Sequence, residues 1–580
     1  MTIFDLLFKN AKYRPNEPAI SWQEGQKSFR LSNSELWIEL KKIISFLRDV
    51  GIEAGDKVGI FAHTSGYWHL ADLSIMAIGA TTVPLYPTAS STELAFIIKD
   101  SQISSIIVED ENARIKVEAI NPDLSIISLK ETNHQNYFLK YREHEGQQTD
   151  EVLKQIKQSV ENHPASIIYT SGTTSTPKGV VTEHKAIMAV LSGIKNQMKG
   201  KVSEGDISLT SLPLSHVLGR CDSLLHLCLP IETYFGESPK TFMNDLRVSK
   251  PSYIITVPRI IEKMRERIEA IVQNKGKLFS KIFTLNYAIA NSYFEKVDSG
   301  GIPSNLEKKV FIKIQKYFFS KIRKQISPSL KFLVSGGAKL GPGTYRFFRN
   351  IGVPILEGYG LTETFGPAFL NSQFNSAPGH VGFPLPGIKM KFASDGEILL
   401  KGESIFECYQ GLELNSFFDE DGYFKTGDIG QWSVTDGLRI TDRKKDIIVT
   451  SGGKNIAPAK VESLMNGCSH ISHFMLVGDS RKYLTGLVSI DKESFADLIE
   501  RGELAPGIEH DELSQNPAII KIIDGEIREI NKQLAHYERV KQFYIIPVSI
   551  APGSLYLSTS MKLKKDKLFN KYIAEINAMY

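Results

Sequence analysis

The segment with the most evident chemical potential runs from Tyr169 to Gly179. It reads Tyr-Thr-Ser-Gly-Thr-Thr-Ser-Thr-Pro-Lys-Gly and follows an apolar, strand-like run. Several hydroxyls, glycines that let a ligand approach backbone N–H groups, and one lysine are what a polyphosphate requires. The segment is not a Walker A loop, because Pro177 rather than glycine precedes Lys178. Taken alone, it is equally typical of a surface turn rich in Ser, Thr and Gly.

A second segment, residues 357–363, joins a hydroxyl to a carboxylate. It reads Glu-Gly-Tyr-Gly-Leu-Thr-Glu, also follows a strand-like run, and ends in Thr362 and Glu363. Mg²⁺ prefers one or two carboxylates together with the phosphate oxygens of a substrate, so this pair suits a phosphate and its metal ion. Tyr359 adds a flat aromatic face for a purine.

Two charged residues further along the chain suit a sugar. Asp428 follows a Thr-Gly turn, where its carboxylate can accept hydrogen bonds from two ribose hydroxyls, and Arg443 can donate to the same sugar. As isolated pieces, Thr426-Gly-Asp428 is more often an ordinary turn, and the charged run of residues 442–446 is more often solvated surface.

These candidate residues follow strands that the hydrophobic pattern places in parallel sheets. Short β-branched runs alternate with helical patterns, which favours βαβ units. In open α/β sheets the loops after the carboxyl ends of the strands form the ligand crevice, so residues 170–179, 335–338 and 357–363 are the places to look for chemistry. The expected strands are 57–62, 81–86, 103–110, 165–170, 252–258, 331–337 and 354–360, and helices are expected at 67–78 and after the capping box Ser90-x-x-Glu93.

The sequence pattern changes at about residue 380. Short strands and glycine turns there predict a small β-rich unit, and beyond residues 442–446 helices and strands mix as in a compact α+β domain. We therefore expect an α/β protein. Residues 1–442 form a large N-terminal domain of layered α/β sheets with a small β-rich subdomain, and residues 443–580 form a small C-terminal α+β domain.

Composition excludes several classes of protein. The 580 residues are 42% hydrophobic, 23% charged and 10% aromatic, which is typical of globular domains and not of a disordered or repetitive chain. A net charge of +4 is too weak to indicate a nucleic-acid partner. The four cysteines are scattered without a CxxC pair, the N-terminus lacks a secretory signal, and no apolar run approaches the ~18 residues of a membrane span. We expect a cytoplasmic protein, with any membrane contact peripheral and on the inner face.

Taken together and in order, the motifs resemble one family. They are YTSGTTSTPKGV, LPLSHVLGR, VPR, SGGAKL, EGYGLTE, TGD, DRKKDIIVTSGGKNIAP and TSMKLKK. This set resembles the acyl-adenylate-forming enzymes, among them acyl-CoA synthetases, luciferases and nonribosomal adenylation domains, over residues 5–570. Within the family it looks most like the long-chain fatty acid–CoA ligases. The chain departs from the family at Ser175, where glycine is usual, and at Lys565, where many relatives carry arginine.

The resemblance implies a role for each nucleotide-binding candidate. The residues that would hold the β- and γ-phosphates of ATP are Thr170, Ser171, Gly172, Thr173, Thr174 and Lys178. Those that would frame adenine are Gly337, Ala338 and Tyr359, and those that would hold ribose are Asp428 and Arg443. By the same resemblance, Thr362 contacts the α-phosphate and Glu363 binds Mg²⁺.

Two further residues would face the acyl group. Lys562 matches the family's mobile lysine, which bridges the acyl carboxylate and the α-phosphate, although MKLKKDK by itself is typical of a solvated basic tail. His216, in LPLSH, either faces the acyl carboxylate directly or only gates the pocket. Arg220 and Arg259 are expected as buried pairing partners outside the site.

The implied reaction converts a medium-to-long-chain fatty acid, ATP and CoA into acyl-CoA through acyl-AMP, with Mg²⁺, and releases AMP and pyrophosphate. In the family the C-terminal domain rotates between the two steps, and the hinge position matches Lys445. Two alternatives remain: an acyl-AMP ligase that loads a carrier protein, and a non-catalytic protein that binds nucleotide and acyl groups.

Residues 307–326 stand apart because they are both basic and aromatic. The segment reads EKKVFIKIQKYFFSKIRKQI. One interpretation is a helix that lies on an anionic membrane surface, where fatty acids partition. The other is an amphipathic helix that packs on the sheet with its lysine stems outward.

Overall fold

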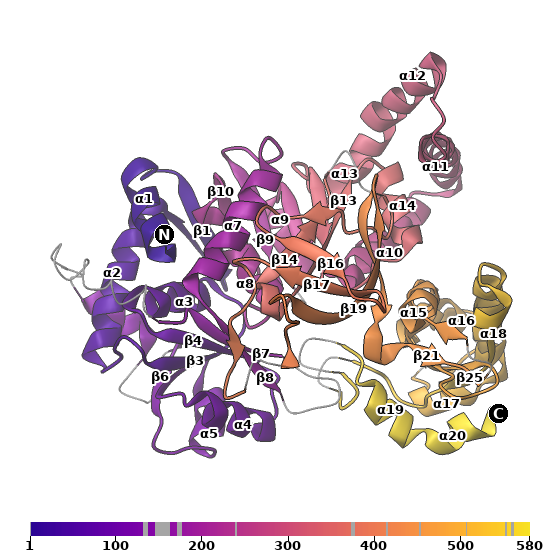
Figure 1. The fold of residues 1–580 in the computed structure, drawn as a ribbon. Helices are drawn as coiled ribbons and strands as arrows, with labels where there is room; N and C mark the ends of the chain where they lie inside the picture. The colour runs from indigo at the N-terminus through magenta and orange to yellow at the C-terminus, as the bar shows by residue number, and fades with distance from the viewer. Residues whose placement is uncertain are drawn as a thin grey trace.

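The computed structural model describes most of the chain as a large body and a smaller C-terminal body (Figure 1). The described residues are 2–130, 137–144, 163–170, 177–237, 241–372, 377–412, 416–451, 454–505, 507–551, 554–557 and 562–580. The architecture is the expected α/β fold with several sheets and an α+β domain at the C-terminus.

One sheet of the large body has seven strands in the order β18-β8-β7-β4-β3-β5-β6. Its centre is parallel, as expected. α3 (Gly66–Ile78) connects the neighbouring strands β3 and β4, and α4 (Ser91–Ser101) connects β4 to β5 on the other side of β3. The side chain of Ser90 accepts the Glu93 N–H and begins α4 as predicted. The strands are β3 (Lys57–Phe61), β4 (Thr81–Leu85), β5 (Ser105–Val108), β6 (Ser125–Ser128), β7 (Ser166–Thr170), β8 (Lys178–Thr182) and β18 (Cys408–Tyr409).

The second sheet has nine strands in the order β15-β14-β13-β12-β11-β9-β10-β1-β2. Its central strands are parallel, and antiparallel strands close both ends. They are β1 (Pro18–Glu24), β2 (Lys27–Ser32), β9 (Asp206–Thr210), β10 (Ile231–Phe235), β11 (Tyr253–Thr256), β12 (Phe332–Ser335), β13 (Ile355–Leu361), β14 (Gly366–Leu370) and β15 (Phe383–Pro384).

One helix between the two sheets, α3, is buried on every side. Every residue of α3 is buried, and it shares one hydrophobic cluster with residues from both sheets. The other helices that contribute to this cluster are α1 (Ile3–Tyr13), α2 (Asn33–Asp49), α7 (His184–Met198) and α8 (Val217–Ser223). A second cluster covers the other face of the nine-stranded sheet, with α9 (Phe242–Ser249), α10 (Pro258–Asn274), α13 (Ser320–Ile326) and α14 (Pro342–Asn350).

The β-rich unit and the C-terminal domain have the secondary structure that the sequence pattern predicts. A four-stranded antiparallel sheet is built from β16 (Lys389–Phe392), β17 (Glu397–Lys401), β19 (Phe424–Ser433) and β20 (Gly437–Arg443). The C-terminal domain contains β21 (Ile448–Val449), β22 (Asn455–Ile456), β23 (Ile471–Val477), β24 (Leu484–Ile490), β25 (Val540–Ile545), α15 (Pro458–Met465), α16 (Ala496–Glu500), α17 (His510–Gln515), α18 (Pro517–Lys532), α19 (Lys565–Lys571) and α20 (Ile573–Ala578).

The basic segment lies in a helical hairpin that projects from the large body (Figure 1). Its first helix is α11 (Lys277–Asp298), and α12 (Asn305–Ile314) returns through a π-helical turn, Gln315–Phe319, into α13. Within the described ranges, no helix is long and apolar enough to cross a membrane.

The four cysteines are free thiols, as expected from their spacing.

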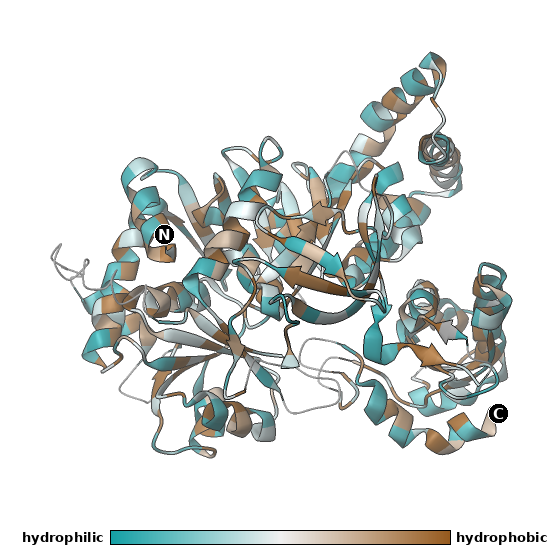
Figure 2. Ribbon diagram, in the orientation of Figure 1, coloured by the Kyte–Doolittle hydropathy of each residue, from teal (hydrophilic) through white to brown (hydrophobic). Residues whose placement is uncertain are grey.

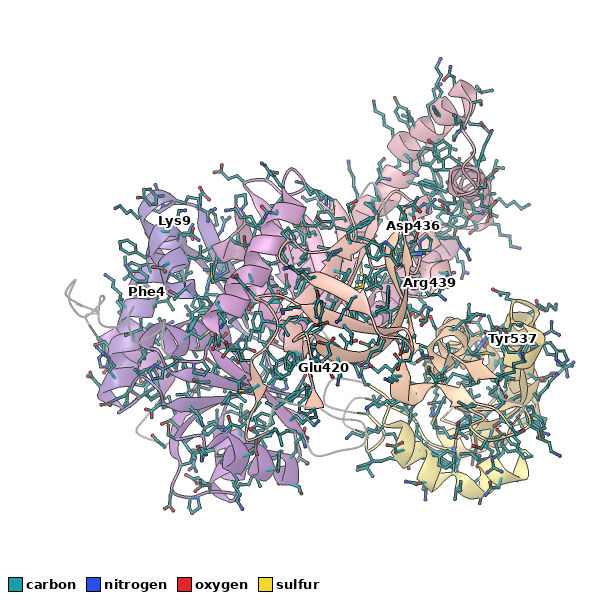
Figure 3. The ribbon with its side chains drawn as sticks, in the orientation of Figure 1. Phe4, Lys9, Glu420, Asp436, Arg439 and Tyr537 are labelled. Atoms are coloured by element: carbon teal, nitrogen blue, oxygen red, sulfur yellow. The ribbon has the colours of Figure 1, made fainter. Side chains whose placement is uncertain are left out.

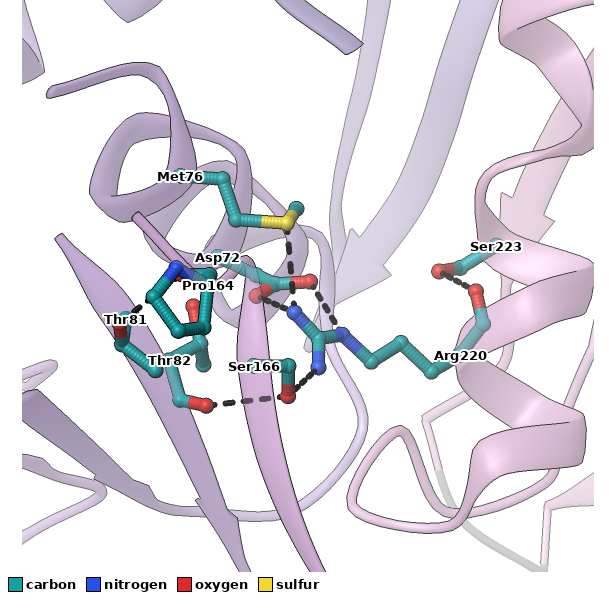
Figure 4. A network of polar contacts seen from close by, with 8 residues as sticks. All are labelled: Asp72, Met76, Thr81, Thr82, Pro164, Ser166, Arg220 and Ser223. Atoms are coloured by element: carbon teal, nitrogen blue, oxygen red, sulfur yellow. Dashed lines mark hydrogen bonds and ion pairs between the residues drawn. The ribbon is translucent and has the colours of Figure 1, made fainter. Parts of the chain in front are cut away.

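A buried ion pair ties α8 to the seven-stranded sheet and its helix α3 (Figure 4). Arg220 donates from Nε and Nη2 to the two carboxylate oxygens of Asp72, at 2.9 and 2.7 Å, and from Nη1 to Ser166 Oγ. Both charged side chains are fully buried. The expectation of a buried partner is therefore confirmed for Arg220. It is wrong for Arg259, whose side chain is 38% exposed and lies 3.8–3.9 Å from Asp491 and Glu262.

Removing one partner of this pair should be costly. We expect Arg220→Met to lower the free energy of unfolding by about 3–5 kcal/mol, because Asp72 would remain buried without a counter-charge. Urea denaturation checks this. Adding Asp72→Leu should recover most of the loss, and Arg528→Met, which breaks an exposed pair with Asp524, should change it by less than about 1 kcal/mol. An equal loss in Arg220→Met and Arg528→Met would contradict the expectation.

Candidate active site

The two described ends of the predicted phosphate segment lie on neighbouring strands. Thr170 ends β7, Lys178 begins β8, and the two residues face each other in the antiparallel register. The predicted residues between them, Ser171, Gly172, Thr173 and Thr174, and the atypical Ser175, lie outside the described part of the chain. Lys178 Nζ lies 4.5 Å from the ring centre of Phe417 and 5.3 Å from that of Tyr409, so aromatic faces hold its ammonium group at this edge.

Tyr409 connects this lysine to the predicted metal ligand. Its hydroxyl donates to Glu363 Oε1 at 2.6 Å, in the short helical turn Thr362–Thr364 that follows β13. Tyr409 itself is positioned by β18, which pairs with β8 opposite Val180. Tyr409 therefore contacts both Lys178 and Glu363, which belong to two different sequence motifs.

The Glu363 carboxylate fits a Mg²⁺ site of the kind that uses substrate oxygens. It is partly exposed, and the Tyr409 hydrogen bond fixes one oxygen while lone pairs remain for a hard cation. Among the described residues there is no group of three or more His, Cys, Asp or Glu side chains that would form an all-protein cage. One carboxylate plus phosphate oxygens is the arrangement that Mg²⁺ commonly adopts.

Close backbone packing explains a glycine of the 357–363 segment. A Cβ on Gly360 would lie 1.8 Å from the carbonyl oxygen of Gly366, on the antiparallel partner β14. A side chain cannot fit there, so the glycine allows β13 and β14 to approach. Tyr359 lies in β13 before the turn, and Thr362 is the first residue of the turn.

Asp428 is the most strongly held of the predicted ribose ligands. Its Oδ2 accepts a hydrogen bond of 2.7 Å from the Tyr359 hydroxyl, and its Oδ1 lies 3.1 Å from Nε of Arg443. Burial raises the pKa of Asp428 and the positive charge of Arg443 opposes that rise. These two contacts occupy one lone pair on each carboxylate oxygen, and a carboxylate can accept further hydrogen bonds, such as those from two vicinal hydroxyls.

His216 sits at the first residue before α8. Its Nδ1 accepts the N–H of Leu218 at 3.2 Å, so the neutral ring carries its proton on Nε2. Burial, and secondarily the charge of Lys562, lowers the pKa of His216 to about 4. At neutral pH the side chain is therefore an uncharged donor through Nε2.

Lys562 comes from the C-terminal domain and reaches this cluster. Desolvation lowers the pKa of Lys562, the like charge of Arg443 adds to the effect, and Asp428 and Glu363 oppose it. The side chain keeps an exposed surface of its own, yet protein groups surround it closely enough to desolvate its charge. The charges that act on it, those of Arg443, Asp428 and Glu363, belong to the large domain.

A pocket opens beside these residues. It has a volume of about 60 Å³ and lies between α7, α8 and strands β11–β14. His216, Gly337 and Tyr359 line it, whereas Ala338 follows on an exposed loop outside the lining. The apolar residues of the lining are Ile194, Met198, Val217, Leu218, Cys221, Ile255, Val334, Pro367 and Leu370.

Sequence reasoning missed two residues of this region. Asp222 of α8 is buried and lines the pocket. The available signal was an aspartate within a mostly apolar run of the sequence. Tyr409 carries no local signal, because its role depends on the distant Glu363 and Lys178.

Comparison with known proteins identifies the class to which this fold and site belong. The model of the AMP-binding enzyme family matches residues 7–410, and that of the AMP-binding enzyme C-terminal domain matches residues 445–580. The chain belongs to the AMP-binding enzyme family.

The relatives of this chain include long-chain acyl-CoA ligases by name. The long-chain-fatty-acid–CoA ligase FadD15 of Mycobacterium bovis is 33% identical over 543 residues, which cover 92% of this chain and 89% of the relative. The peroxisomal long chain acyl-CoA synthetase 7 of Arabidopsis thaliana is 27% identical, with 91% of this chain and 78% of the relative covered.

Solved structures show the same fold at lower identity. The adenylation domain of a carboxylate reductase from Mycobacterium chelonae has a TM-score of 0.75 at 20% identity, covering 100% of this chain and 91% of that one. The o-succinylbenzoate CoA synthetase of Bacillus subtilis, solved with its acyl-adenylate, has a TM-score of 0.68 at 19% identity, covering 98% of each chain.

Proposed function

We propose that this protein is an AMP-forming fatty acid–CoA ligase. It would join a medium-to-long-chain fatty acid to ATP as acyl-AMP, release pyrophosphate, and transfer the acyl group to CoA with release of AMP. The observation that carries the proposal is the approach of Lys562 to Glu363, Asp428 and Arg443 beside an apolar pocket.

An apolar pocket is what a fatty acid requires. Each methylene that leaves water for such a pocket contributes ~0.8 kcal/mol, so the apolar lining favours an acyl substrate. The names of the FadD15 and Arabidopsis relatives, both long-chain acyl-CoA ligases, support the same substrate class.

In the proposed first step, an oxygen of the fatty carboxylate attacks the α-phosphorus of ATP and the bond to the pyrophosphate oxygen breaks. The attack places extra negative charge on the α-phosphate, and Lys562 with Thr362 would stabilise it. His216 Nε2–H would donate to the attacking carboxylate and orient it. Since the ring is neutral at working pH, it donates this hydrogen bond as an uncharged group.

The remaining predicted residues would position ATP. Asp428 and Arg443 would hold the ribose, with Gly337, Ala338 and Tyr359 around adenine. The β- and γ-phosphates would be held by Thr170, Ser171, Gly172, Thr173, Thr174 and Lys178. Glu363 would hold Mg²⁺, which neutralises phosphate charge when bound.

We propose the division into residues 1–442 and 443–580 with Lys445 as the hinge. Lys445 lies in the short helical turn Lys444–Asp446, directly after β20. Contacts across the proposed boundary include the hydrogen bond of 3.3 Å from the Ala459 N–H to Asp442 and the long Arg259–Asp491 pair. Lys562 is needed in the first step and must leave before CoA can reach the acyl carbonyl, so rotation of this domain would serve both steps.

Two other functions make different predictions for the products. An acyl-AMP ligase that loads a carrier protein would form acyl-AMP but no thioester with CoA, and a binding protein would form neither. Peripheral contact of residues 307–326 with the inner face of a membrane belongs to the leading proposal, because fatty acids partition into bilayers.

One assay separates the three. The protein is incubated with ATP, Mg²⁺ and palmitate, with and without CoA, while pyrophosphate, AMP and palmitoyl-CoA are followed. The ligase gives pyrophosphate in both cases and thioester with AMP only with CoA. Pyrophosphate without thioester supports the carrier-protein alternative, and no pyrophosphate contradicts both enzymes.

Lys562→Ala should abolish the first half-reaction selectively. We expect ATP–pyrophosphate exchange to fall by more than about a hundredfold, because a charge that stabilises the transition state is lost. Conversion of supplied acyl-AMP and CoA to thioester should remain near the wild-type rate. Lys567→Ala, an exposed lysine on α19, is the matched control and should leave both rates unchanged. Exchange at the wild-type rate in Lys562→Ala would refute the assignment.

Lys445→Pro should impair thioester formation, the second half-reaction, more than acyl-AMP formation, the first. Proline fixes φ near −65°, which is compatible with a short helical turn but prevents the dihedral change of a hinge. We expect thioester formation from supplied acyl-AMP to fall at least about tenfold more than ATP–pyrophosphate exchange. Lys445→Ala controls for loss of the side chain. Equal losses in the two half-reactions of the proline variant would count against the hinge.

A further inference from the structure

A helical arm, residues 277–326, extends from the large body away from the proposed active site (Figures 1 and 3). It consists of α11 and the helical return through α12 to α13. Only Ala290 is buried among the 22 residues of α11. The apolar residues of α11 must therefore be explained by something other than burial in the core of the large body.

Part of the reason is the packing of one face. Tyr293 of α11 stacks on Phe311 of α12 with ring centres 4.2 Å apart, and Phe283 contacts Phe347 of α14. Asn350 Nδ2 also donates to Asn291 Oδ1 at 3.1 Å. The aromatic residues therefore hold the arm together and fix it to the body.

The opposite face of α11 is aliphatic and exposed. Leu278, Ile282 and Leu285 follow the spacing i, i+4, i+7, which places them on one side of the helix. Leu278 is 74% exposed and Leu285 is 64% exposed. Ile302 and Leu306, near the turn between the helices, are exposed as well, and hydrophobic residues recur along the arm in Figure 2. This outer face takes no part in the internal packing.

Charge is concentrated on the same arm. Residues 277–326 contain ten Lys and Arg and three acidic residues, a net charge of +7, so the rest of the chain carries −3 of the total of +4. Two of the three acids form ion pairs, Asp298 with Arg349 and Glu307 with Lys296. The exposed lysines are Lys277, Lys281, Lys308, Lys309, Lys313, Lys316, Lys321 and Lys324.

We propose that the outer face of the arm docks on an anionic lipid bilayer. Exposed aliphatic side chains flanked by lysines match an interface where headgroup charge borders hydrocarbon. A nucleic acid would neutralise the lysines but leave the aliphatic residues in water. The proposal extends the expected contact of residues 307–326 to α11 and deepens the proposed function, since a bilayer is the source of long-chain acids.

The charge part of the proposal is tested by co-sedimentation with vesicles of phosphatidylcholine, with and without phosphatidylglycerol. Wild-type protein should bind the anionic vesicles and release them as salt rises. Four Lys→Gln changes at 308, 309, 313 and 316 should weaken binding more than about tenfold, since each lysine near the surface contributes ~1 kcal/mol. The control carries the same four-charge change at the exposed residues Lys199, Lys482, Lys521 and Lys541, and should bind within about twofold of wild type.

The apolar part is tested by Leu278→Ser, Ile282→Ser and Leu285→Ser together. Because these residues face outward, the triple variant should keep the wild-type melting temperature and ATP–pyrophosphate exchange while losing more than about tenfold in vesicle binding. The proposal is overturned if wild type does not bind, if the control loses as much as the arm variants, or if the arm variants only change the oligomeric state. Vesicle binding needs no turnover, so failure of the ligase assay leaves this test intact.

A second inference rests on a carboxyl group in the pocket. Asp222 of α8 lines it and is 1% exposed. Its two oxygens accept hydrogen bonds from Ser208 Oγ at 3.1 Å and Thr210 Oγ1 at 2.6 Å, both on β9. Desolvation raises the pKa of Asp222 to about 7. The polar bridge closes the space between the helix and the sheet.

The geometry points to Asp222 as the residue that ends the acyl pocket. A chain that continued past it would break both hydrogen bonds and lay methylenes against a desolvated carboxyl, which is unfavourable. The upper limit of acyl length would then be set here. This inference rests on the proposed function, because it requires that the pocket take the acyl chain.

The chain-length profile of ATP–pyrophosphate exchange tests this. With octanoate, laurate, palmitate and stearate, Asp222→Ala should shift the optimum of kcat/KM to longer acids, by about fourfold for each methylene newly admitted. Asp222→Ser is a second opening variant should the first be unstable, and Asp222→Asn should keep the wild-type profile. Asp245→Ala, at a buried aspartate bonded to Thr241 away from the pocket, is the control. An unchanged profile in folded opening variants overturns the inference, whereas absence of exchange with every acid in wild type overturns the proposed function instead.

Discussion

A carboxylate removed from water must find donors, and Asp428 organises the centre of this molecule by that requirement. Burial alone would favour its neutral form. The Tyr359 hydroxyl from the nine-stranded sheet and the Arg443 guanidinium from the β-rich sheet supply the compensation. Satisfying one carboxylate therefore joins two sheets at a fixed geometry. The cation of Lys562 then approaches a region whose charges are already paired and oriented.

The requirement that a buried charge be paired also positions α8, which forms one wall of the pocket. Arg220 could not be buried in α8 without Asp72, and the pair holds that helix against the seven-stranded sheet. His216 at one end of α8 and Asp222 near the other are positioned as a consequence. The arm shows the opposite arrangement, in which lysines and aliphatic side chains both remain at the surface.

Much of the fold could be predicted because its signals are local. The β-branched run at 81–86 became β4, and Ser90 began α4, since each depends on neighbours in the sequence. The pattern did not predict that β8 and β14 run antiparallel to their neighbours, because strand direction depends on the connections of the whole sheet. Arg220 and Arg259 looked alike in the sequence, yet only the first is enclosed on all sides.

For the site, the amino-acid sequence already contains the chemical groups: hydroxyls and a lysine for phosphates, a Thr–Glu pair, an aspartate after a turn, and a lysine near the C-terminus. Their order was enough to indicate the family. Only the tertiary structure decided that Tyr409 orients Glu363, that Asp428 is held from two sheets, and that Lys562 meets them from another domain. Local patterns follow from backbone geometry and side-chain type, whereas these contacts join residues tens to hundreds of positions apart and exist only once the whole chain has packed.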